Sequence, residues 1–241
     1  MNKYPILNTY VNNINEKELN NFIFNQIKFK NKSLVGNLNI NAANLSNEGT
    51  YLKEFNDKSD IVFCDGSGIQ LACYLKQFKP IPPKITYNTW FPRLMELCSI
   101  KKVKVYVLGS TNQVNKKAIY KLKEKFPKLM IDGHHGYFDR NKNSDKIIEK
   151  INQFDPDILA VGLGMPIQEE WIIKNYKKIN SHIFLNGGAF LDWISGKSIQ
   201  CPQFISDIGM EWLWRLFLSP RRLIHRYVIG NFSFFINFLK K

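Results

Sequence analysis

Asp65 is the residue of this sequence whose type and setting best suit proton-transfer chemistry. It follows the apolar run Ile61 to Cys64 and precedes Gly66-Ser67-Gly68, so its carboxylate is expected where a buried strand ends and backbone can approach a ligand closely. A carboxylate there can take a proton from a hydroxyl, which contributes about 10²- to 10⁴-fold to a rate. Asp is also favoured as a helix N-cap or in an Asp-Gly turn, and the local sequence leaves these alternatives open.

A second candidate is the loop Gly162-Leu163-Gly164, which precedes a predicted helix. Two glycines before a helix N-terminus can form a cradle for a diphosphate. Pro166 suits the first turn of that helix, and Glu169 and Glu170 suit the positive end of its dipole, which explains both acids structurally. Gln168 is either a capping partner within that helix or a ligand-facing side chain.

Several other chemistries find no support. Neither glycine-rich segment has the third glycine of a dinucleotide fingerprint, and no Gly-Lys-Ser/Thr phosphate loop follows a strand. The neighbours His134 and His135 suit a loop better than one shared metal. Asp155 and Asp157 are spaced like metal-holding acids but precede a strand, so we predict no catalytic metal there. The cysteines lack zinc or disulfide spacing and are expected to be free thiols: Cys64, Cys73, Cys98 and Cys201.

The elements that must position these residues follow a βαβα rhythm. Short apolar runs predict strands, and amphipathic segments between them predict helices, which together indicate an α/β fold with a mostly parallel sheet covered on both faces. The predicted strands are 33–40, 60–64, 103–108, 128–132, 158–161 and 182–185, and the predicted helices include 112–126, 143–154 and 166–179.

Ligand groups in such sheets gather at the carboxyl ends of the strands. Four predicted strand ends are polar or glycine-rich: Cys64-Asp65-Gly66, Leu108-Gly109-Ser110, Gly162-Leu163-Gly164 and Asn186-Gly187-Gly188. Because parallel strands present these ends at one edge, we expect a single shared pocket.

Net charge indicates an anionic partner. The 241 residues include 34 Lys and Arg against 20 Asp and Glu, a formal charge of +14, which suits nucleotide phosphates, acidic lipid headgroups or nucleic acid. No zinc-finger or ribonucleoprotein signature accompanies the charge, so nucleic acid is supported by charge alone. The first thirty residues do not resemble a secretory signal, and a cytosolic location is expected.

The composition changes near Gly196, which predicts a catalytic core over 1–195 and a basic, aromatic appendage over 196–241. From Trp212 onward the chain contains no acid. The stretch Tyr227 to Leu239 is too short to cross a bilayer, but its aromatic and basic residues suit a helix lying in a membrane interface. The alternatives are a C-terminal helix packed on the sheet and a dimer contact.

Taken in order, the motifs resemble those of the WecG/TagA/CpsF glycosyltransferase family. The resemblance runs through most of the chain and lies in these segments: Asn39-Ile40-Asn41-Ala42, Cys64-Asp65-Gly66-Ser67-Gly68-Ile69, His135-Gly136-Tyr137-Phe138, Gly162-Leu163-Gly164-Met165-Pro166-Ile167-Gln168-Glu169, Gly187-Gly188-Ala189-Phe190-Leu191-Asp192, Gly209-Met210-Glu211-Trp212-Leu213-Trp214-Arg215-Leu216 and Pro220-Arg221-Arg222.

The resemblance implies a Rossmann-like core that binds a UDP-sugar without a metal or other cofactor and transfers the sugar, with inversion, to an undecaprenyl-diphosphate-linked sugar. It implies work in surface polysaccharide or teichoic acid synthesis, at the inner face of the bacterial membrane. Asp65 becomes the base. The implied acceptor-binding residues are Asn39, Asn41 and Thr86; the nucleotide-sugar residues are Gly109, Tyr137, Gln168 and Asp192; and the diphosphate residues are Arg215, Arg222 and Arg226.

One segment departs from the family pattern. Where many members place Arg before a Gly-x-Asp element, this chain has Lys84-Ile85-Thr86-Tyr87-Asn88-Thr89-Trp90. Lys cannot reproduce a bidentate Arg contact, and Thr89 has no carboxylate, so the identity of the sugar is left open. The oligomeric state is open too. The alternative function is a non-catalytic basic module that binds nucleic acid or an anionic membrane.

Overall fold

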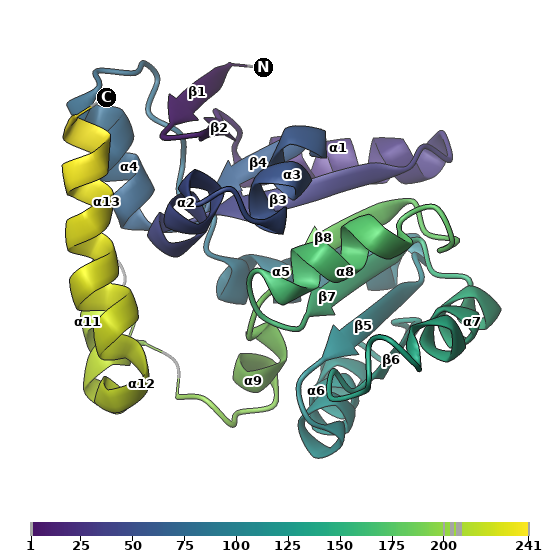
Figure 1. The fold of residues 1–241 in the computed structure, drawn as a ribbon. Helices are drawn as coiled ribbons and strands as arrows, with labels where there is room; N and C mark the ends of the chain where they lie inside the picture. The colour runs from purple at the N-terminus through teal and green to yellow at the C-terminus, as the bar shows by residue number, and fades with distance from the viewer. Residues whose placement is uncertain (1, 200, 203–204, 206–208, 241) are drawn as a thin grey trace.

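A six-stranded parallel sheet forms the centre of the computed structural model (Figure 1). The structure describes residues 2–199, 201–202, 205 and 209–240, except for the side chain of Arg222. The strand order is β4-β3-β8-β7-β5-β6, and every pairing within this sheet is parallel. The strands are β3 (Ser33–Leu38), β4 (Ile61–Cys64), β5 (Val105–Gly109), β6 (Ile131–His134), β7 (Ile158–Gly162) and β8 (Ile183–Asn186). The α/β prediction is confirmed.

Helices cover both faces of the sheet because its strands are apolar on both sides. Val105 and Val107 of β5 belong to one buried cluster, whereas Tyr106 and Leu108 belong to another on the opposite face. The first cluster includes residues of α1 (Glu16–Lys28), α5 (Tyr87–Lys101), α6 (Asn112–Lys125) and α9 (Phe190–Ile194). The second includes residues of α3 (Tyr51–Lys58), α7 (Ser144–Phe154) and α8 (Ile167–Asn175).

A third cluster lies beside the β4 edge and joins the two ends of the chain. It unites the antiparallel hairpin β1 (Lys3–Ile6) and β2 (Thr9–Asn12) with α2 (Ile40–Asn47), α4 (Ser67–Leu75) and the last helix, α13 (Gly230–Leu239). Phe234 and Phe238 of α13 are 0% and 2% exposed within it. Asn44 of α2 also donates from Nδ2 to the carbonyl of Gly230 at 2.8 Å.

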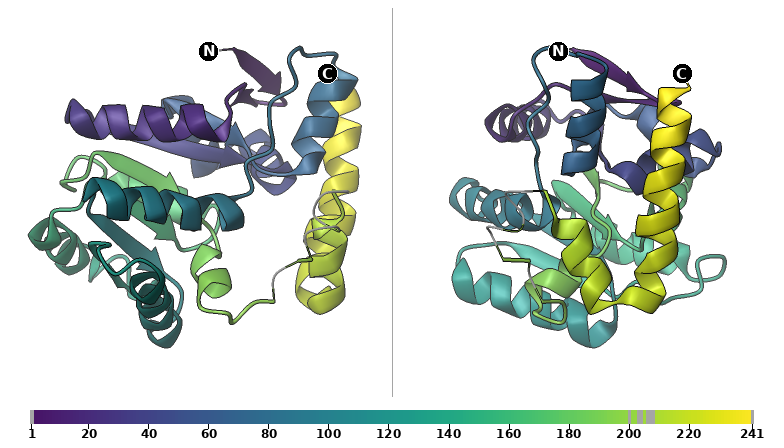
Figure 2. Two further views of the ribbon diagram at one scale, coloured as in Figure 1. Left: turned by 180° about the vertical axis from the view of Figure 1, so that it is seen from behind. Right: turned by 90° about the vertical axis from the view of Figure 1, so that its left-hand side faces the viewer.

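The C-terminal helices form an arm along one end of the sheet (Figures 1 and 2). The arm contains α11 (Glu211–Leu218), α12 (Pro220–Ile224), a π-helical turn η1 (His225–Ile229) and α13. The alternative of a helix packed on the core is therefore correct for Phe234 and Phe238. The opposite face of the arm leaves apolar side chains exposed, and the interfacial role of that face stays a proposal. The division at residue 195 likewise stays a prediction.

Some predicted boundaries were wrong. The first strand ends at Leu38, and Ile40 begins α2, because the Asn39 side chain accepts a hydrogen bond from the Ala42 N–H at 3.0 Å and caps the helix. The helix predicted to reach Ile179 is assigned only to Asn175. In the described part of the chain, no helix is long and apolar enough to cross a membrane.

Candidate active site

Asp65 lies at the carboxyl end of β4, next to the start of α4. The N-cap of α4 is Gly66, with φ of 121° and no side-chain hydrogen bond to the helix. The Asp65 carboxylate therefore does not cap this helix. The carboxylate instead accepts from Nδ2 of Asn39 at 3.3 Å and from the backbone N–H of Tyr87. Three segments, after β3, after β4 and at the start of α5, thus meet at one carboxylate.

Burial is the main influence on the proton affinity of Asp65. It raises the pKa of the carboxyl above its ordinary value, and Glu211 adds to the rise, whereas Arg215, Asn39 and the Tyr87 N–H oppose it. A raised pKa makes the ionised carboxylate a stronger base than an exposed aspartate. The setting suits removal of a proton from a bound hydroxyl.

Of the three residues predicted to bind the acceptor, one contacts this carboxylate and two have other partners. Asn39 contacts it directly. Asn41 contacts the loop before α8, with Nδ2 at 3.9 Å from Sδ of Met165. Thr86 precedes Tyr87 as the N-cap of α5, and its carbonyl accepts from Oγ1 of Thr89 at 3.1 Å. Thr89, one of the departures from the family pattern, is thus satisfied within its own helix.

Glycine backbones bring the other strand ends into contact. A Cβ on Gly109 would lie 2.5 Å from the carbonyl oxygen of Gly162, and a Cβ on Gly162 would lie 2.6 Å from that of Gly188. Neither position tolerates a side chain without movement of backbone. The ends of β5, β7 and β8 therefore lie against one another, whereas the single shared pocket stays a prediction.

Gln168 connects two of these loops through hydrogen bonds to their backbone. Its side chain is fully buried, and Oε1 accepts from the N–H groups of Gly164 at 3.2 Å and Gly188 at 3.0 Å. Its Nε2 donates to Oε1 of Glu169 at 2.7 Å. Gln168 thus shapes the candidate diphosphate cradle through its glycines, and a direct contact with the nucleotide sugar stays a prediction.

Glu169 belongs to a buried hydrogen-bond network in addition to its place at the start of α8. Its side chain is fully buried, Asn186 also donates to Oε1 at 2.7 Å, and Oε2 has no hydrogen-bond partner among the described residues. Burial raises its pKa to about 7, against the hydrogen bonds from Asn186 and Gln168. Sequence reasoning missed this network because first-turn glutamates usually face solvent.

Asp192 lies close to the end of β5. Ser110 donates from Oγ to Oδ1 of Asp192 at 2.6 Å, and Nζ of Lys197 lies 3.3 Å from Oδ2. The Asp192 side chain is 17% exposed. It can therefore accept hydrogen bonds from a ligand hydroxyl at the Gly109–Ser110 exit, as acids of dinucleotide sites do with ribose.

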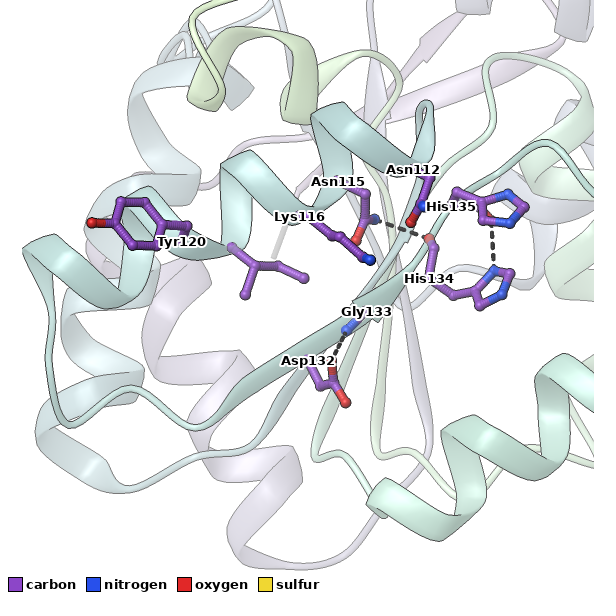
Figure 3. A pocket seen from close by; sticks show the side chains of 9 residues that line it. Asn112, Asn115, Lys116, Tyr120, Asp132, Gly133, His134 and His135 are labelled. Carbon is purple, nitrogen blue, oxygen red and sulfur yellow. Dashed lines mark hydrogen bonds between the residues drawn. The ribbon is translucent and has the colours of Figure 1, made fainter.

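Tyr137 projects into solvent beside the same exit. Its side chain is 75% exposed, and the neighbouring Gly136 N–H donates to the carbonyl of Ser110 at 2.8 Å. A hollow of about 470 Å³ lies alongside, between α6 and β6 (Figure 3). It is lined by Asn112, Asn115, Lys116, Ile119, Tyr120 and Asp132–His135, and Asp65 is not among them. A second hollow of about 510 Å³, around Trp171 and Lys174, also lies apart from Asp65.

Arg215 brings the arm to the catalytic candidate. Its guanidinium stacks over the Trp193 ring at 4.8 Å and lies 3.9 Å from Oε1 of Glu211. Burial acts to lower its pKa, but Tyr227, Glu211 and Asp65 outweigh it and raise the pKa above the ordinary value. Gly209 reaches the same place, because a Cβ there would lie 3.0 Å from the Ser67 side chain. Arg215 and Gly209 therefore place the start of the arm and the residues before it near the end of β4.

The other predicted diphosphate residues are less directly placed. Arg226, in η1, lies over the ring of its neighbour Tyr227 at 5.5 Å. Arg222 belongs to α12, but its side chain lies outside the described residues. Lys84 places Nζ 3.5 Å from Oγ of Ser67, so this cation approaches the start of α4.

Asp157 lies away from the site and has a structural role. Asp157 accepts from the backbone N–H of Lys104 at 2.8 Å, at the opposite end of β7 from the glycine loop. Among the described residues, no cluster of three His, Cys, Asp or Glu side chains is suited to a metal ion. All four cysteines are free thiols, and three of them are buried.

Comparison with known proteins identifies the family. Residues 4–241 match the model of the glycosyl transferase WecG/TagA/CpsF family. Similar curated proteins include N-acetylglucosaminyldiphosphoundecaprenol N-acetyl-beta-D-mannosaminyltransferases from Staphylococcus aureus strains MRSA252 and NCTC 8325 / PS 47. Each is 31% identical over 174 residues, which cover 72% of this chain and 66% of the relative. Because the family match covers nearly the whole chain, the protein belongs to the WecG/TagA/CpsF family of glycosyl transferases.

Proposed function

We propose that this protein is an inverting glycosyltransferase. It moves N-acetylmannosamine or a related hexose from a UDP-sugar to an undecaprenyl-diphosphate-linked sugar, for surface polysaccharide or teichoic acid synthesis. The observation that carries the proposal is the Asp65 carboxylate, held by Asn39 at a strand exit and faced by Arg215 from the arm. The relatives' names support the same acceptor class and the transfer of N-acetylmannosamine.

The proposed reaction is a direct displacement. Asp65 takes the proton from the acceptor hydroxyl while the hydroxyl oxygen forms a bond to the anomeric carbon of the donor. The bond from that carbon to the phosphate oxygen breaks, and its electron pair leaves with UDP. Arg215 and the N-terminus of α8 offset the charge that develops on the diphosphate. No metal or other cofactor is part of this proposal.

The donor is proposed to lie across the exits of β5, β7 and β8. Asp192 and Tyr137 border the β5 exit and are the proposed contacts for the nucleoside. The loop Gly162–Gly164 precedes α8 and is the proposed cradle for the diphosphate. In this arrangement the anomeric carbon lies between that loop and Asp65, consistent with the contact of Asn41 with Met165.

Thermal unfolding with nucleotides separates this function from a basic binding module. A ligand that binds only the native state stabilises it, by about 2.7 kcal/mol at 100 times its Kd. We expect UDP to raise the melting temperature, CDP to raise it less, and single-stranded RNA or duplex DNA to leave it unchanged. A shift with RNA or DNA and none with UDP would refute the transferase and favour the basic module.

The exposed face of the arm supports a peripheral location at the cytoplasmic face of the membrane. Apolar residues with at least a third of their surface exposed run along it: Leu213, Phe217, Ile224, Val228, Ile229, Phe232, Ile236 and Leu239. No acid follows Glu211 in the sequence. An apolar face flanked by cations is suited to anionic lipid. A homo-oligomer is an alternative use of this face.

Substitution of two exposed residues tests the membrane proposal. The double variant Phe232→Ser and Leu239→Ser is expected to lower binding to phosphatidylglycerol-containing vesicles at least about tenfold, because each buried apolar side chain contributes about 1.5–3 kcal/mol. Co-sedimentation measures the effect. The control is Phe29→Ser, which removes a 66% exposed phenylalanine at the far end of α1. Equal binding by the double variant and the control would contradict the proposal.

Deletion of the tail is a poorer test of membrane binding. It would remove Phe234 and Phe238 from the cluster that contains α2 and α4. Loss of two buried phenylalanines destabilises a core by several kcal/mol, so lost binding would report unfolding.

A further inference from the structure

The side chain of Tyr87 is held rigidly beside the candidate base. Tyr87 begins α5, and the residue is 5% exposed. Four aromatic rings surround it at centroid distances of 5.4 to 6.4 Å: Phe63, Trp90, Phe91 and Phe190. A ring packed on so many sides has one available position, so the place of its hydroxyl is fixed by the core.

Tyr87 connects two parts of the candidate site, because its hydroxyl lies at one of them and its backbone N–H at the other. A Cβ on Gly187 would lie 2.9 Å from the Tyr87 oxygen, which places the hydroxyl at the exit of β8. The backbone N–H of Tyr87 donates to the carboxylate of Asp65. Burial, and then the charge of Asp65, raise the pKa of Tyr87 well above its ordinary value, so the hydroxyl keeps its proton and can donate it in a hydrogen bond.

The hydroxyl has no hydrogen-bond partner among the described residues. A buried hydroxyl without a partner costs free energy, because it gives up hydrogen bonds to water on folding and gains none. Phenylalanine would fill the same aromatic cluster without that cost. The packing of the ring therefore does not explain why the oxygen is present.

We propose that the Tyr87 hydroxyl donates a hydrogen bond to an oxygen of a sugar bound between Asp65 and the Gly187–Gly188 loop. The inference rests on the proposed function and adds a specificity-determining contact to it. A hydroxyl or an acetamido carbonyl of the sugar supplies the acceptor oxygen. A site built around a fixed donor discriminates against sugars that lack the matching oxygen, because the buried donor is then left unpaired. Tyr87 also lies in the Lys84–Trp90 segment that departs from the family pattern.

The test compares Tyr87→Phe with the unmodified protein in two measurements. The first is thermal unfolding without ligand, where the variant is expected to melt at the same temperature or higher because it loses an unpaired polar group. The second is transfer from UDP-N-acetylmannosamine to a synthetic lipid-diphosphate-linked N-acetylglucosamine, where kcat/KM is expected to fall about tenfold. An effect on the KM of the donor or of the acceptor shows which sugar carries the oxygen.

The matched control is Tyr74→Phe, which removes the hydroxyl of a 65% exposed tyrosine on α4 and should change neither measurement. Two results would overturn the inference: a kcat/KM for Tyr87→Phe within twofold of the unmodified protein, or a clearly lower melting temperature, which would show a structural partner for the hydroxyl. Absence of transfer by the unmodified protein with every UDP-sugar would instead refute the proposed function, and the inference with it.

Discussion

Replacing Asp65 with asparagine is expected to lower the rate of transfer by about 10²- to 10⁴-fold without unfolding the protein. The amide has the shape of the carboxylate and can still accept from Asn39 through its oxygen, but it cannot take a proton from the acceptor hydroxyl. Near neutral pH the variant should be at least as stable as the unmodified protein, because burial disfavours the charge that the substitution removes. UDP protection in thermal unfolding should persist.

The matched control for this substitution is Asp57→Asn. Asp57 is an exposed acid on α3 that pairs with Lys53, so its loss should leave transfer unchanged. Turnover by Asp65→Asn within about threefold of the unmodified protein would remove Asp65 from the role of base.

The pH dependence of transfer follows from the same carboxyl. Asp65 must be ionised to act as a base, so kcat/KM should rise with pH through its pKa in the free enzyme. Because burial raises that pKa, the rise should lie at a higher pH than the ordinary value of 3.8 for an aspartate. The residual activity of Asp65→Asn should lack this rise with pH. A rise with pH that persists in the variant would arise from a titratable group other than Asp65.

Replacing Arg215 with alanine is expected to lower kcat by about 10²- to 10³-fold, the effect of removing one preorganised donor to a developing negative charge. The guanidinium is fixed by Trp193 and Glu211, so it is already in place before the reaction. The same substitution should move the rise of activity with pH to a higher pH, because Arg215 lowers the pKa of Asp65 and this influence is lost. Steady-state rates at saturating donor over a range of pH measure both effects.

Arg93→Ala is the control for a lost arginine. Arg93 lies on α5 and forms an exposed pair with Glu16 of α1, so its removal should change kcat less than twofold. If Arg215→Ala keeps both its kcat and its dependence on pH, the arm does not contribute charge to the reaction.

The sheet could be predicted from sequence because most of its strands are short apolar runs with a polar or glycine-rich end. The exception is β6, whose residues Ile131–His134 include Asp132 and Gly133, so the predicted run 128–132 overlaps it at only two residues. The β1–β2 hairpin could not be predicted, because its turn uses Leu7 with φ of 54° and contains no glycine that would indicate a turn. The helix α5 was missed because Pro92 interrupts an aromatic-rich segment. The helix α1 had a usable signal, since Asn15 and Glu18 form a capping box.

The site was predictable only where neighbouring strands supply it. Asn39 and Asp65 follow the paired strands β3 and β4, so their contact could be anticipated from a parallel sheet. The position of Arg215 could not be anticipated, because the course of the arm depends on where Phe234 packs. Tyr87 was missed because the start of α5 reaches Asp65 through tertiary packing rather than through a motif.

Product analysis with purified protein tests the central claim most directly. The protein would be incubated with UDP-N-acetylmannosamine or other UDP-hexoses and a synthetic lipid-diphosphate-linked N-acetylglucosamine, with mass spectrometry for the product and NMR for its anomeric configuration. We expect one sugar added to the acceptor, one UDP released per transfer, and inversion at the anomeric carbon. Retained configuration, or no sugar transferred from any UDP-hexose to that acceptor, would contradict a direct displacement assisted by Asp65.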